Sequence, residues 1–92
     1  MTVRQLRTTP NFQRQYRRLT RSIQREANET AQQLRLNPLD ASLGVKKLED
    51  VAGNLYRVAL CGEYRLVYSF TKSAVVLHHI GHRRDVYETL TL

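Results

Sequence analysis

Near its carboxyl end the chain gathers side chains that could handle a phosphate group. The segment IGHRRDVYETL, residues 80–90, places His82, Arg83, Arg84 and Tyr87 directly after an apolar run. Guanidinium groups bind phosphate oxygens with two parallel donors and stabilise the charge that develops on a phosphorane. Histidine titrates near neutral pH and can pass protons to and from ribose oxygens. This combination is typical of phosphodiester cleavage in RNA.

Two more arginines, Arg57 and Arg65, lie in strand-like runs upstream, LYRVAL (55–60) and EYRLVYSF (63–70). Side chains alternate between the two faces of a strand, so each run directs one arginine away from its aromatic side. With AVVLHHIG (74–81), these runs predict an antiparallel meander.

The turn between the first two runs decides whether the arginines meet. A two-residue turn at Cys61–Gly62 would place them on opposite faces of the sheet. A three-residue loop with Gly62 in a left-handed bulge position sets Arg57 directly opposite Arg65. Only the second register also gathers seven apolar residues on one face, so we predict it: Tyr56, Val58, Leu60, Tyr64, Leu66, Tyr68 and Phe70.

Opposed arginines on a sheet face repel, which predicts a compensating anion. A bound phosphate would supply it, and ion pairs with Glu63 or Asp85 are the alternative.

Charge and composition point the same way. Fifteen Lys and Arg against eight Asp and Glu give a net charge of +7, which favours a polyanionic partner. For the helical arginines, a solvated basic face explains the sequence equally well. One cysteine excludes an internal disulfide framework, and no stretch is apolar enough for a signal peptide or a membrane span. We therefore expect a cytoplasmic protein that does not contact the membrane.

The remaining pattern predicts one α+β domain over residues 1–92. Residues 2–7 read as a first strand, and Thr9 and Pro10 as the start of a helix with an apolar stripe that includes Phe12 and Tyr16. A second helix ends before Pro38, and VKKLE (45–49) is a short element in the following loop. We expect a four-stranded antiparallel sheet, an N-terminal helical hairpin packed on one face, and a short C-terminal helix.

Three residues with reactive side chains are assigned no catalytic role. His78 and His79 are neighbours on a strand and should point to opposite faces, which argues against a shared metal. Cys61 lies in a turn with no fixed partner. We expect neither a metal nor a cofactor.

The order of elements and the motifs KKL, YRV, EYRLVY and GHRRDVY resemble the RelE family of toxins, within the RelE/ParE superfamily. The resemblance spans nearly the whole chain and is strongest from Val45 to Tyr87. It implies a metal-independent endoribonuclease that cleaves messenger RNA in the A site of the 70S ribosome, by attack of a 2′ hydroxyl on the phosphate. It also implies a cognate acidic antitoxin that holds the toxin in an inactive hetero-oligomer.

The resemblance assigns roles to individual residues. Arg65 and Arg83 would stabilise the transition state, and Tyr87 would stack on a base and orient the attacking hydroxyl. Arg57 would bind or activate the RNA. His82 is the candidate for the general base, because Ala59 occupies a position that is basic in relatives. The expected RNA-binding residues are Lys46, Lys47 and Arg84.

Two other functions fit the same sequence. A ParE-like inhibitor of DNA gyrase would share the fold without needing convergent arginines. A basic RNA-binding module without catalysis is the third possibility. An antitoxin helix is expected in a groove beside the helical hairpin.

Overall fold

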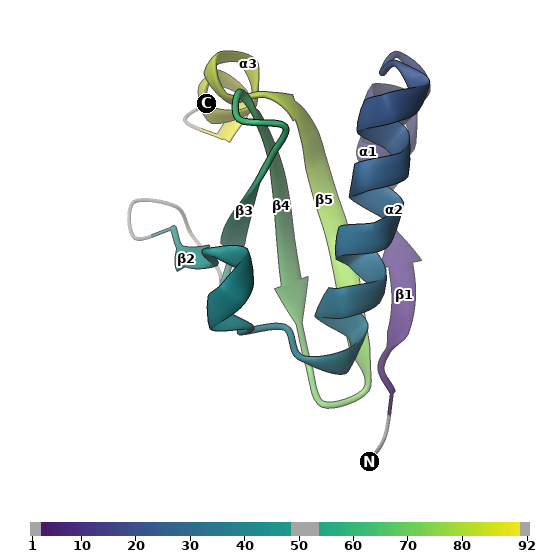
Figure 1. Cartoon of the computed structure of the whole chain (residues 1–92), viewed down its shortest axis with the longest axis vertical. Coiled ribbons are helices and arrows are strands. Elements are labelled where there is room, and N and C mark those ends of the chain that lie inside the picture. Colours follow the sequence, from purple (N-terminus) through teal and green to yellow (C-terminus); the bar gives the residue numbers. More distant parts are fainter. Residues whose placement is uncertain (1–2, 49–53, 91–92) are drawn as a thin grey trace.

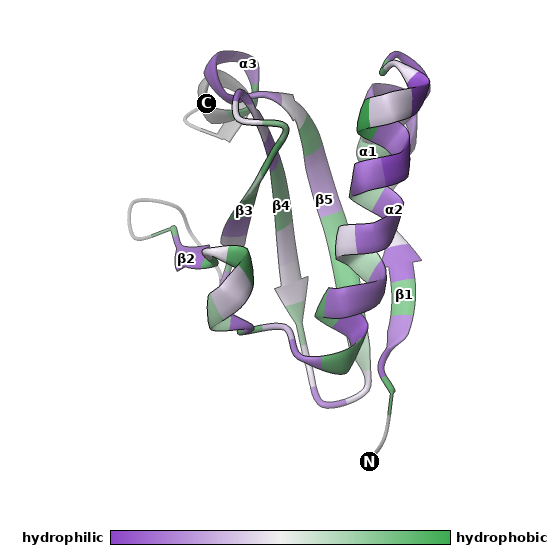
Figure 2. Cartoon of the chain, in the orientation of Figure 1, coloured by the Kyte–Doolittle hydropathy of each residue, from purple (hydrophilic) through white to green (hydrophobic). Residues whose placement is uncertain are grey.

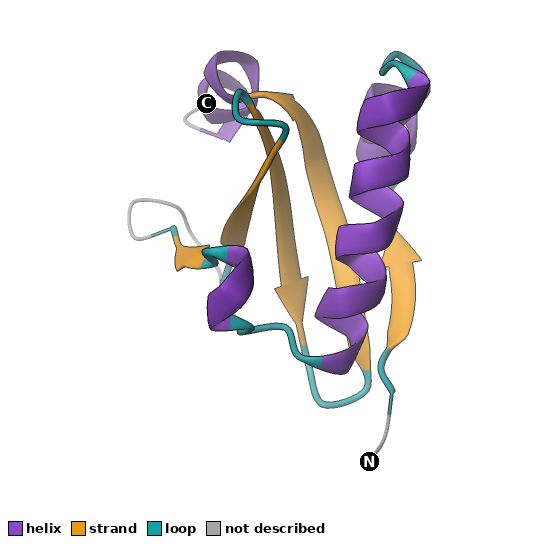
Figure 3. Ribbon diagram, in the orientation of Figure 1, coloured by secondary structure: helices purple, strands orange, loops and turns teal. Residues whose placement is uncertain are grey.

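The computed structural model describes residues 3–48 and 54–90, with the side chains of residues 87–90 excepted. One strand and two helices are followed by a short 3-10 helix, four further strands and a C-terminal helix (Figures 1 and 3). In chain order they are β1 (Gln5–Thr8), α1 (Pro10–Arg17), α2 (Arg21–Leu36), the 3-10 helix η1 (Ala41–Leu43), β2 (Lys46–Lys47), β3 (Tyr56–Leu60), β4 (Tyr64–Phe70), β5 (Ala74–His82) and α3 (Arg83–Leu90). The α+β class, the two N-terminal helices, the meander and the C-terminal helix are confirmed.

The sheet differs from the predicted four antiparallel strands. In the described part it has five strands in the order β1-β5-β4-β3-β2, and β1 pairs parallel to β5. The fifth strand is β2, two residues within the expected short element VKKLE. All four residues of β1 are exposed, so its side-chain pattern carries no information about the direction of its partner.

Both N-terminal helices contribute to the core on one face of the sheet, α1 through Phe12 and α2 through Ala27, Ala31 and Leu34, and α1 also closes an edge of β5. α1 lies along the part of β5 that β1 does not reach. Where the pairing with β1 ends, the N–H of Thr9 donates to the carbonyl of Leu77 over 3.1 Å, and the Thr9 hydroxyl donates to the carbonyl of His78 over 3.2 Å. The N–H of Ile80 donates to the side chain of Gln15 over 2.9 Å. Thr9 and α1 therefore supply hydrogen-bond partners for backbone groups at the edge of β5.

α2 packs on the face of the sheet that carries the aromatic residues. Its stripe includes Ala27, Ala31 and Leu34, all nearly or fully buried, and the two alanines let the helix approach closely. The sheet contributes Val58, Leu60, Leu66, Tyr68 and Ile80. Figure 2 shows the contrast between hydrophobic stretches of the central strands and the largely hydrophilic exposed side of α2. The predicted apolar face is thus the core face.

Tyr68 is the largest fully buried side chain, and its hydroxyl has a partner. It donates to the carbonyl of Pro38, at the end of the turn that follows α2. Burial raises the pKa of Tyr68, so the phenol keeps its proton and remains a donor. No helix in residues 3–48 and 54–90 has the length and apolar character needed to cross a bilayer.

Thr9 makes a measurable contribution to stability. Its hydroxyl accepts from the N–H of Phe12 over 3.1 Å, capping α1, while it donates to β5. We expect Thr9→Ala to lower the free energy of unfolding by about 1–2 kcal/mol, measured by urea denaturation. Thr20→Ala is the matched control, because Thr20 precedes α2 without a side-chain cap bond. Equal losses in the two variants would contradict this assignment.

Candidate functional site

The face opposite α2 carries the predicted arginines. Residues directly opposite in a ladder share a face, and Lys46 pairs with Arg57, which pairs in turn with Val67. On its other side Val67 pairs with His79 of β5. One row across four strands therefore runs from Lys46 through Arg57 to His79, with the fully buried Val67 between the arginine and the histidine. We call this the basic face.

Arg65 lies on the same face, but not directly opposite Arg57 as predicted. Its partner is Ala59, so the two arginines are diagonal neighbours. The loop consists of residues 61–63, with positive φ at both Cys61 (47°) and Gly62 (76°). This placement keeps Leu60 in the ladder opposite Tyr64, where it is 2% exposed. Burial of Leu60 therefore overrides the expected turn, and the diagonal spacing of about 7–8 Å weakens the expected repulsion.

The Arg65 guanidinium is fixed by the backbone. Its Nη1 donates to the carbonyls of Gly62 over 2.6 Å and of Tyr64 over 2.9 Å. Its Nε is buried without a partner, the one such side-chain nitrogen or oxygen in the described part. A buried donor left unpaired costs about 1–3 kcal/mol.

The start of α3 covers part of the basic face next to Arg65. Arg65 pairs with Gly81, and a Cβ at Gly81 would come 3.3 Å from the buried side chain of Val86. Glycine at this position allows α3 to pack closely on β5. Arg83, the first residue of α3, is therefore held at the end of the strand pair that carries Arg65.

Glu63 binds Arg83 and not the two strand arginines. Its carbonyl accepts from the N–H of Arg83 over 2.8 Å, and its carboxylate lies 3.3 Å from the Arg83 Nε. The same oxygen lies 3.7 Å from the Nε2 of His82. Because Glu63 and Arg83 are more than half exposed, this pair is weak and screened by salt, and a phosphate could displace it.

His82 does not join the basic face. It pairs with Tyr64 on the face covered by the helices, and the two rings meet edge to face with centroids 5.9 Å apart. It lines a cavity of about 280 Å³ between α1 and the end of β5, together with Arg18 and Leu19.

The other predicted residues divide between several positions. Lys47 pairs with Tyr56 and so belongs to the face opposite Lys46. Arg84 is exposed in the first turn of α3. Tyr87 follows Arg83 by one helical turn, but its side chain lies outside the described residues. The structure thus brings Lys46, Arg57 and Arg65 onto one face, with Arg83 at its end.

The two adjacent histidines overturn a prediction. A bulge between Val67 and Tyr68 leaves His78 as the extra residue of β5, so His78 and His79 do not alternate between faces. His78 Nε2 lies 2.8 Å from the hydroxyl of Ser69, and His79 Nδ1 lies 2.7 Å from the Asn11 amide. Sequence alternation alone could not reveal the bulge.

Neither a metal cluster nor a reactive thiol emerges in the described residues. No group of three or more His, Cys, Asp or Glu side chains is placed to hold a metal ion there. Cys61 donates its thiol proton to Glu26, and this bond raises the pKa of the Cys61 thiol. A raised pKa reduces the thiolate fraction and hence the nucleophilicity.

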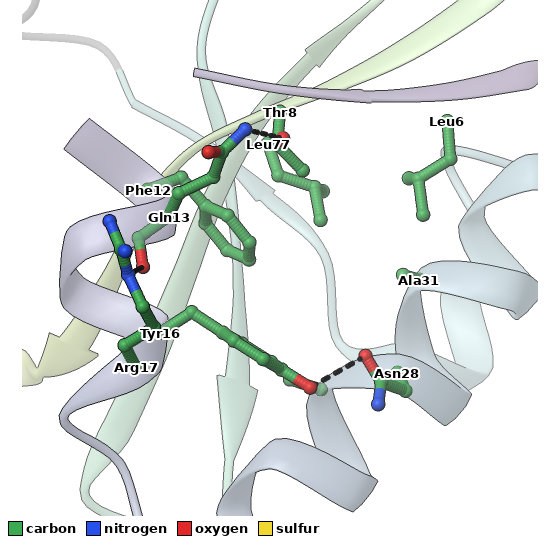
Figure 4. Close-up of a pocket in the computed structure, with 10 residues that line it drawn as sticks. Leu6, Thr8, Phe12, Gln13, Tyr16, Arg17, Asn28, Ala31 and Leu77 are labelled. Carbon is green, nitrogen blue, oxygen red and sulfur yellow. Dashed lines mark hydrogen bonds between the residues drawn. The ribbon is translucent and has the colours of Figure 1, made fainter. Parts of the chain in front are cut away.

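A separate apolar groove of about 450 Å³ opens between β1, α1 and α2 (Figure 4). Tyr16 extends across it and donates from its hydroxyl to Asn28 over 3.2 Å, while Arg17 lies at its border. Its apolar lining comes from Leu6, Phe12, Tyr16, Ala27, Ala31 and Leu77.

Comparison with known proteins gives a consistent result for the fold. The chain superposes on RelE of the archaeal RelE–RelB complex from Pyrococcus horikoshii with a TM-score of 0.74 and 21% identity, covering 89% of this chain and 97% of that one. The toxin–antitoxin complex RelBE2 from Mycobacterium tuberculosis gives 0.75 and 26%, covering 90% and 94%. The chain has the fold of the RelE toxins.

The likeness to RelE is found by comparison of structures and not by comparison of sequences. A double arginine-to-alanine mutant of Escherichia coli RelE in the free state gives a TM-score of 0.76 at 18% identity, covering 98% of this chain and 96% of that one. No family model and no curated protein sequence matches the chain. The resemblance to RelE that the motifs indicate is therefore confirmed through the structure.

The two histidines of β5 should make stability depend on pH. Burial lowers the pKa of both His78 and His79, and for His79 the neighbouring His78 lowers it further. As pH falls through about 6.5, the unfolded chain binds protons that the folded chain excludes. We therefore expect the free energy of unfolding to decrease from pH 7.5 to 5.5 in chemical denaturation. The double variant His78→Gln/His79→Gln should show a shallower decrease, and an unchanged slope would contradict the assignment.

Proposed function

We propose that this protein is the toxin of a type II toxin–antitoxin system and cleaves messenger RNA on the 70S ribosome in the cytoplasm. The observation that carries the proposal is the arrangement of Arg57 and Arg65 on one face. No hydrogen bond or ion pair joins the Arg57 side chain to a described residue, and the Arg65 guanidinium is held by the carbonyls of Gly62 and Tyr64. Both groups are suited to a phosphate bound between them.

The fold likeness supports the choice of a toxin. The similar structures include RelE bound to RelB from Pyrococcus horikoshii and a RelB–RelE antitoxin–toxin complex from Methanococcus jannaschii. YafQ from E. coli also matches, with a TM-score of 0.66 at 14% identity, covering 91% of this chain and 98% of that one.

In the proposed reaction the 2′ oxygen of the RNA attacks the adjacent phosphorus, and the bond to the 5′ oxygen breaks. The departing 5′ oxygen takes a proton from water, so a 2′,3′-cyclic phosphate and a free 5′ hydroxyl result, and no metal or cofactor takes part. Arg65 is preorganised by the carbonyls of Gly62 and Tyr64, so it can bind the developing phosphorane charge without reorganising. Arg57 and Arg83 would complete the cluster.

Proton transfer and RNA binding fall to the remaining residues. His82 is proposed to take the 2′ proton, with Tyr87 stacking on a base. Because His82 lies beside Tyr64 on the other face, the RNA has to bend around the end of β5 to reach it. Lys46, Lys47 and Arg84 would bind phosphates to either side, and all three are exposed.

Loss of one cluster arginine should abolish most of the activity without unfolding the chain. We expect Arg65→Ala or Arg83→Ala to slow cleavage of translated mRNA about 100-fold or more, and Tyr87→Phe to slow it as well. Each variant should relieve growth inhibition. Lys72→Ala removes an exposed cation from the opposite end of β5 and should leave cleavage unchanged.

Cleavage at the wild-type rate by all three site variants would refute the site. Chromosomal breaks with an SOS response, in place of cuts within codons, would identify a gyrase inhibitor. Binding to programmed ribosomes without a cut would identify a non-catalytic RNA-binding module.

We further propose that the apolar groove holds a helix of the antitoxin. The groove is lined by apolar side chains with Arg17 at its border, and the helices α1 and α2 that form it carry further exposed arginines: Arg14, Arg18, Arg21 and Arg25. An acidic segment with an apolar stripe would match both the lining and the charge, and electrostatic attraction would speed its association.

Leu6 offers a direct test of this docking site, because it lines the groove and is 37% exposed. Leu6→Glu should abolish neutralisation by the co-expressed acidic antitoxin, since it places a negative charge in the apolar groove opposite an acidic helix. Leu39→Glu is the matched control, because Leu39 is an exposed leucine (53%) outside the groove. Full neutralisation of Leu6→Glu would place the antitoxin elsewhere.

A further inference from the structure

His79 is a half-buried histidine on the basic face to which neither the motifs nor the proposed mechanism assigns a role. It pairs with Val67, and Val67 is the neighbour of Arg57 in the same row. It is also a diagonal neighbour of Arg65, which pairs with Gly81 two residues further along β5. On one face of a sheet, diagonal neighbours lie about 7–8 Å apart, within reach of one bound phosphate.

The protonation of His79 is determined by a residue of α1. The Oδ1 of Asn11 accepts from Arg14 over 3.4 Å, so the amide nitrogen of Asn11 faces His79 Nδ1 at 2.7 Å and donates to it. A neutral imidazole that accepts at Nδ1 carries its proton on Nε2. Asn11 therefore selects the Nε2–H tautomer.

The Nε2 of His79 is available to a ligand. The hydrogen bond of the His79 ring to Asn11 uses Nδ1, and no described group forms a hydrogen bond with Nε2. Nε2–H is thus left without a described acceptor, on the same face of the sheet as Arg57 and Arg65. Burial and the neighbouring His78 lower the pKa of His79, so the ring stays neutral at physiological pH and still offers a donor.

We propose that His79 donates a hydrogen bond from Nε2 to the RNA phosphate held by Arg57 and Arg65, and that Asn11 is its positioning residue. This inference rests on the proposed function and adds a neutral donor to the cluster. A fixed donor aimed at the position where negative charge develops stabilises the transition state more than the bound substrate.

Substitutions of His79 separate a donor from a structural role. His79→Leu should slow cleavage of translated mRNA on the order of 10- to 100-fold. His79→Gln should retain most of the activity, because its amide nitrogen can donate from the place of Nε2 while its oxygen accepts from Asn11. His78→Gln is the matched control on the same strand and should cleave as the wild type does. Wild-type cleavage by His79→Leu would overturn the proposal.

Asn11→Asp gives a signature that a structural role would not produce. The new carboxylate would accept from Nδ1–H, so neutral His79 would carry its lone pair on Nε2 and lose the donor. The charged or titratable groups on this side of the sheet are Arg14 on α1, His78 on β5, Arg65 on β4 and Arg57 on β3, and α3 adds Arg83, Arg84 and Asp85. Glu63 pairs with Arg83 and His82. The carboxylate should raise the pKa of His79.

The rate constant for cleavage in Asn11→Asp should therefore fall as pH rises through that raised pKa, whereas the wild type has no such step. A pH profile parallel to that of the wild type would contradict the proposal. Nitrogen-15 NMR of the imidazole adds a readout that needs no cleavage: wild-type His79 should show the Nε2–H tautomer and respond to an uncleavable 2′-deoxy oligonucleotide. If the wild-type protein cuts no RNA, the proposed function fails, while the NMR titration still tests the contact between His79 and phosphate.

Discussion

The pairing of β3 with β4 determines which side chains enter the core and which lie on the basic face. Cys61 and Gly62 both take positive φ, so the strands reverse in three residues and Leu60 stays opposite Tyr64 in the core. Because side chains alternate along a strand, the same register that buries Leu60 and Leu66 directs Arg57 and Arg65 to the other face. A slip of one residue would exchange the two sets and expose the core.

Short elements cover the two edges of the sheet, and they also contribute residues to the candidate site. β1 pairs with the first half of β5, and α1 satisfies the second half through Thr9 and Gln15. This arrangement places Asn11 against His79 at the border of the basic face. At the opposite edge β2 is only two residues long, and its Lys46 extends the row that begins at His79. The elements that close the edges thus contribute charged or polar groups to the face.

Much of this architecture could be predicted from the sequence, because local patterns determine it. The cap at Thr9, the apolar stripes of α1 and α2, and the alternation in β3 and β4 each reflect contacts within a few residues. The assignment of Arg57 and Arg65 to one face followed from the same alternation. Their direct pairing did not, because the position of the loop depends on the burial of Leu60 against the rest of the core.

The features that the sequence could not provide arise from long-range contacts. The parallel direction of β1 depends on how α1 and α2 return the chain, and a strand of four exposed residues gives no sign of it. The bulge at His78 is visible only when β5 is paired with β4, so His78 and His79 were assigned to opposite faces. His82 follows Gly81 in the same strand, and the same pairing determines that it meets Tyr64 and not the arginines.

In the proposed mechanism the arginines of the basic face support attack by a ribose 2′ hydroxyl on the neighbouring phosphate. Ribosomes programmed with a message that carries a single 2′-deoxynucleotide at the A-site cleavage position test it most directly. With the purified protein, we expect the all-ribose message to be cut to a 2′,3′-cyclic phosphate end and the substituted message to stay intact. Cleavage of the substituted message at the same position and rate would contradict it.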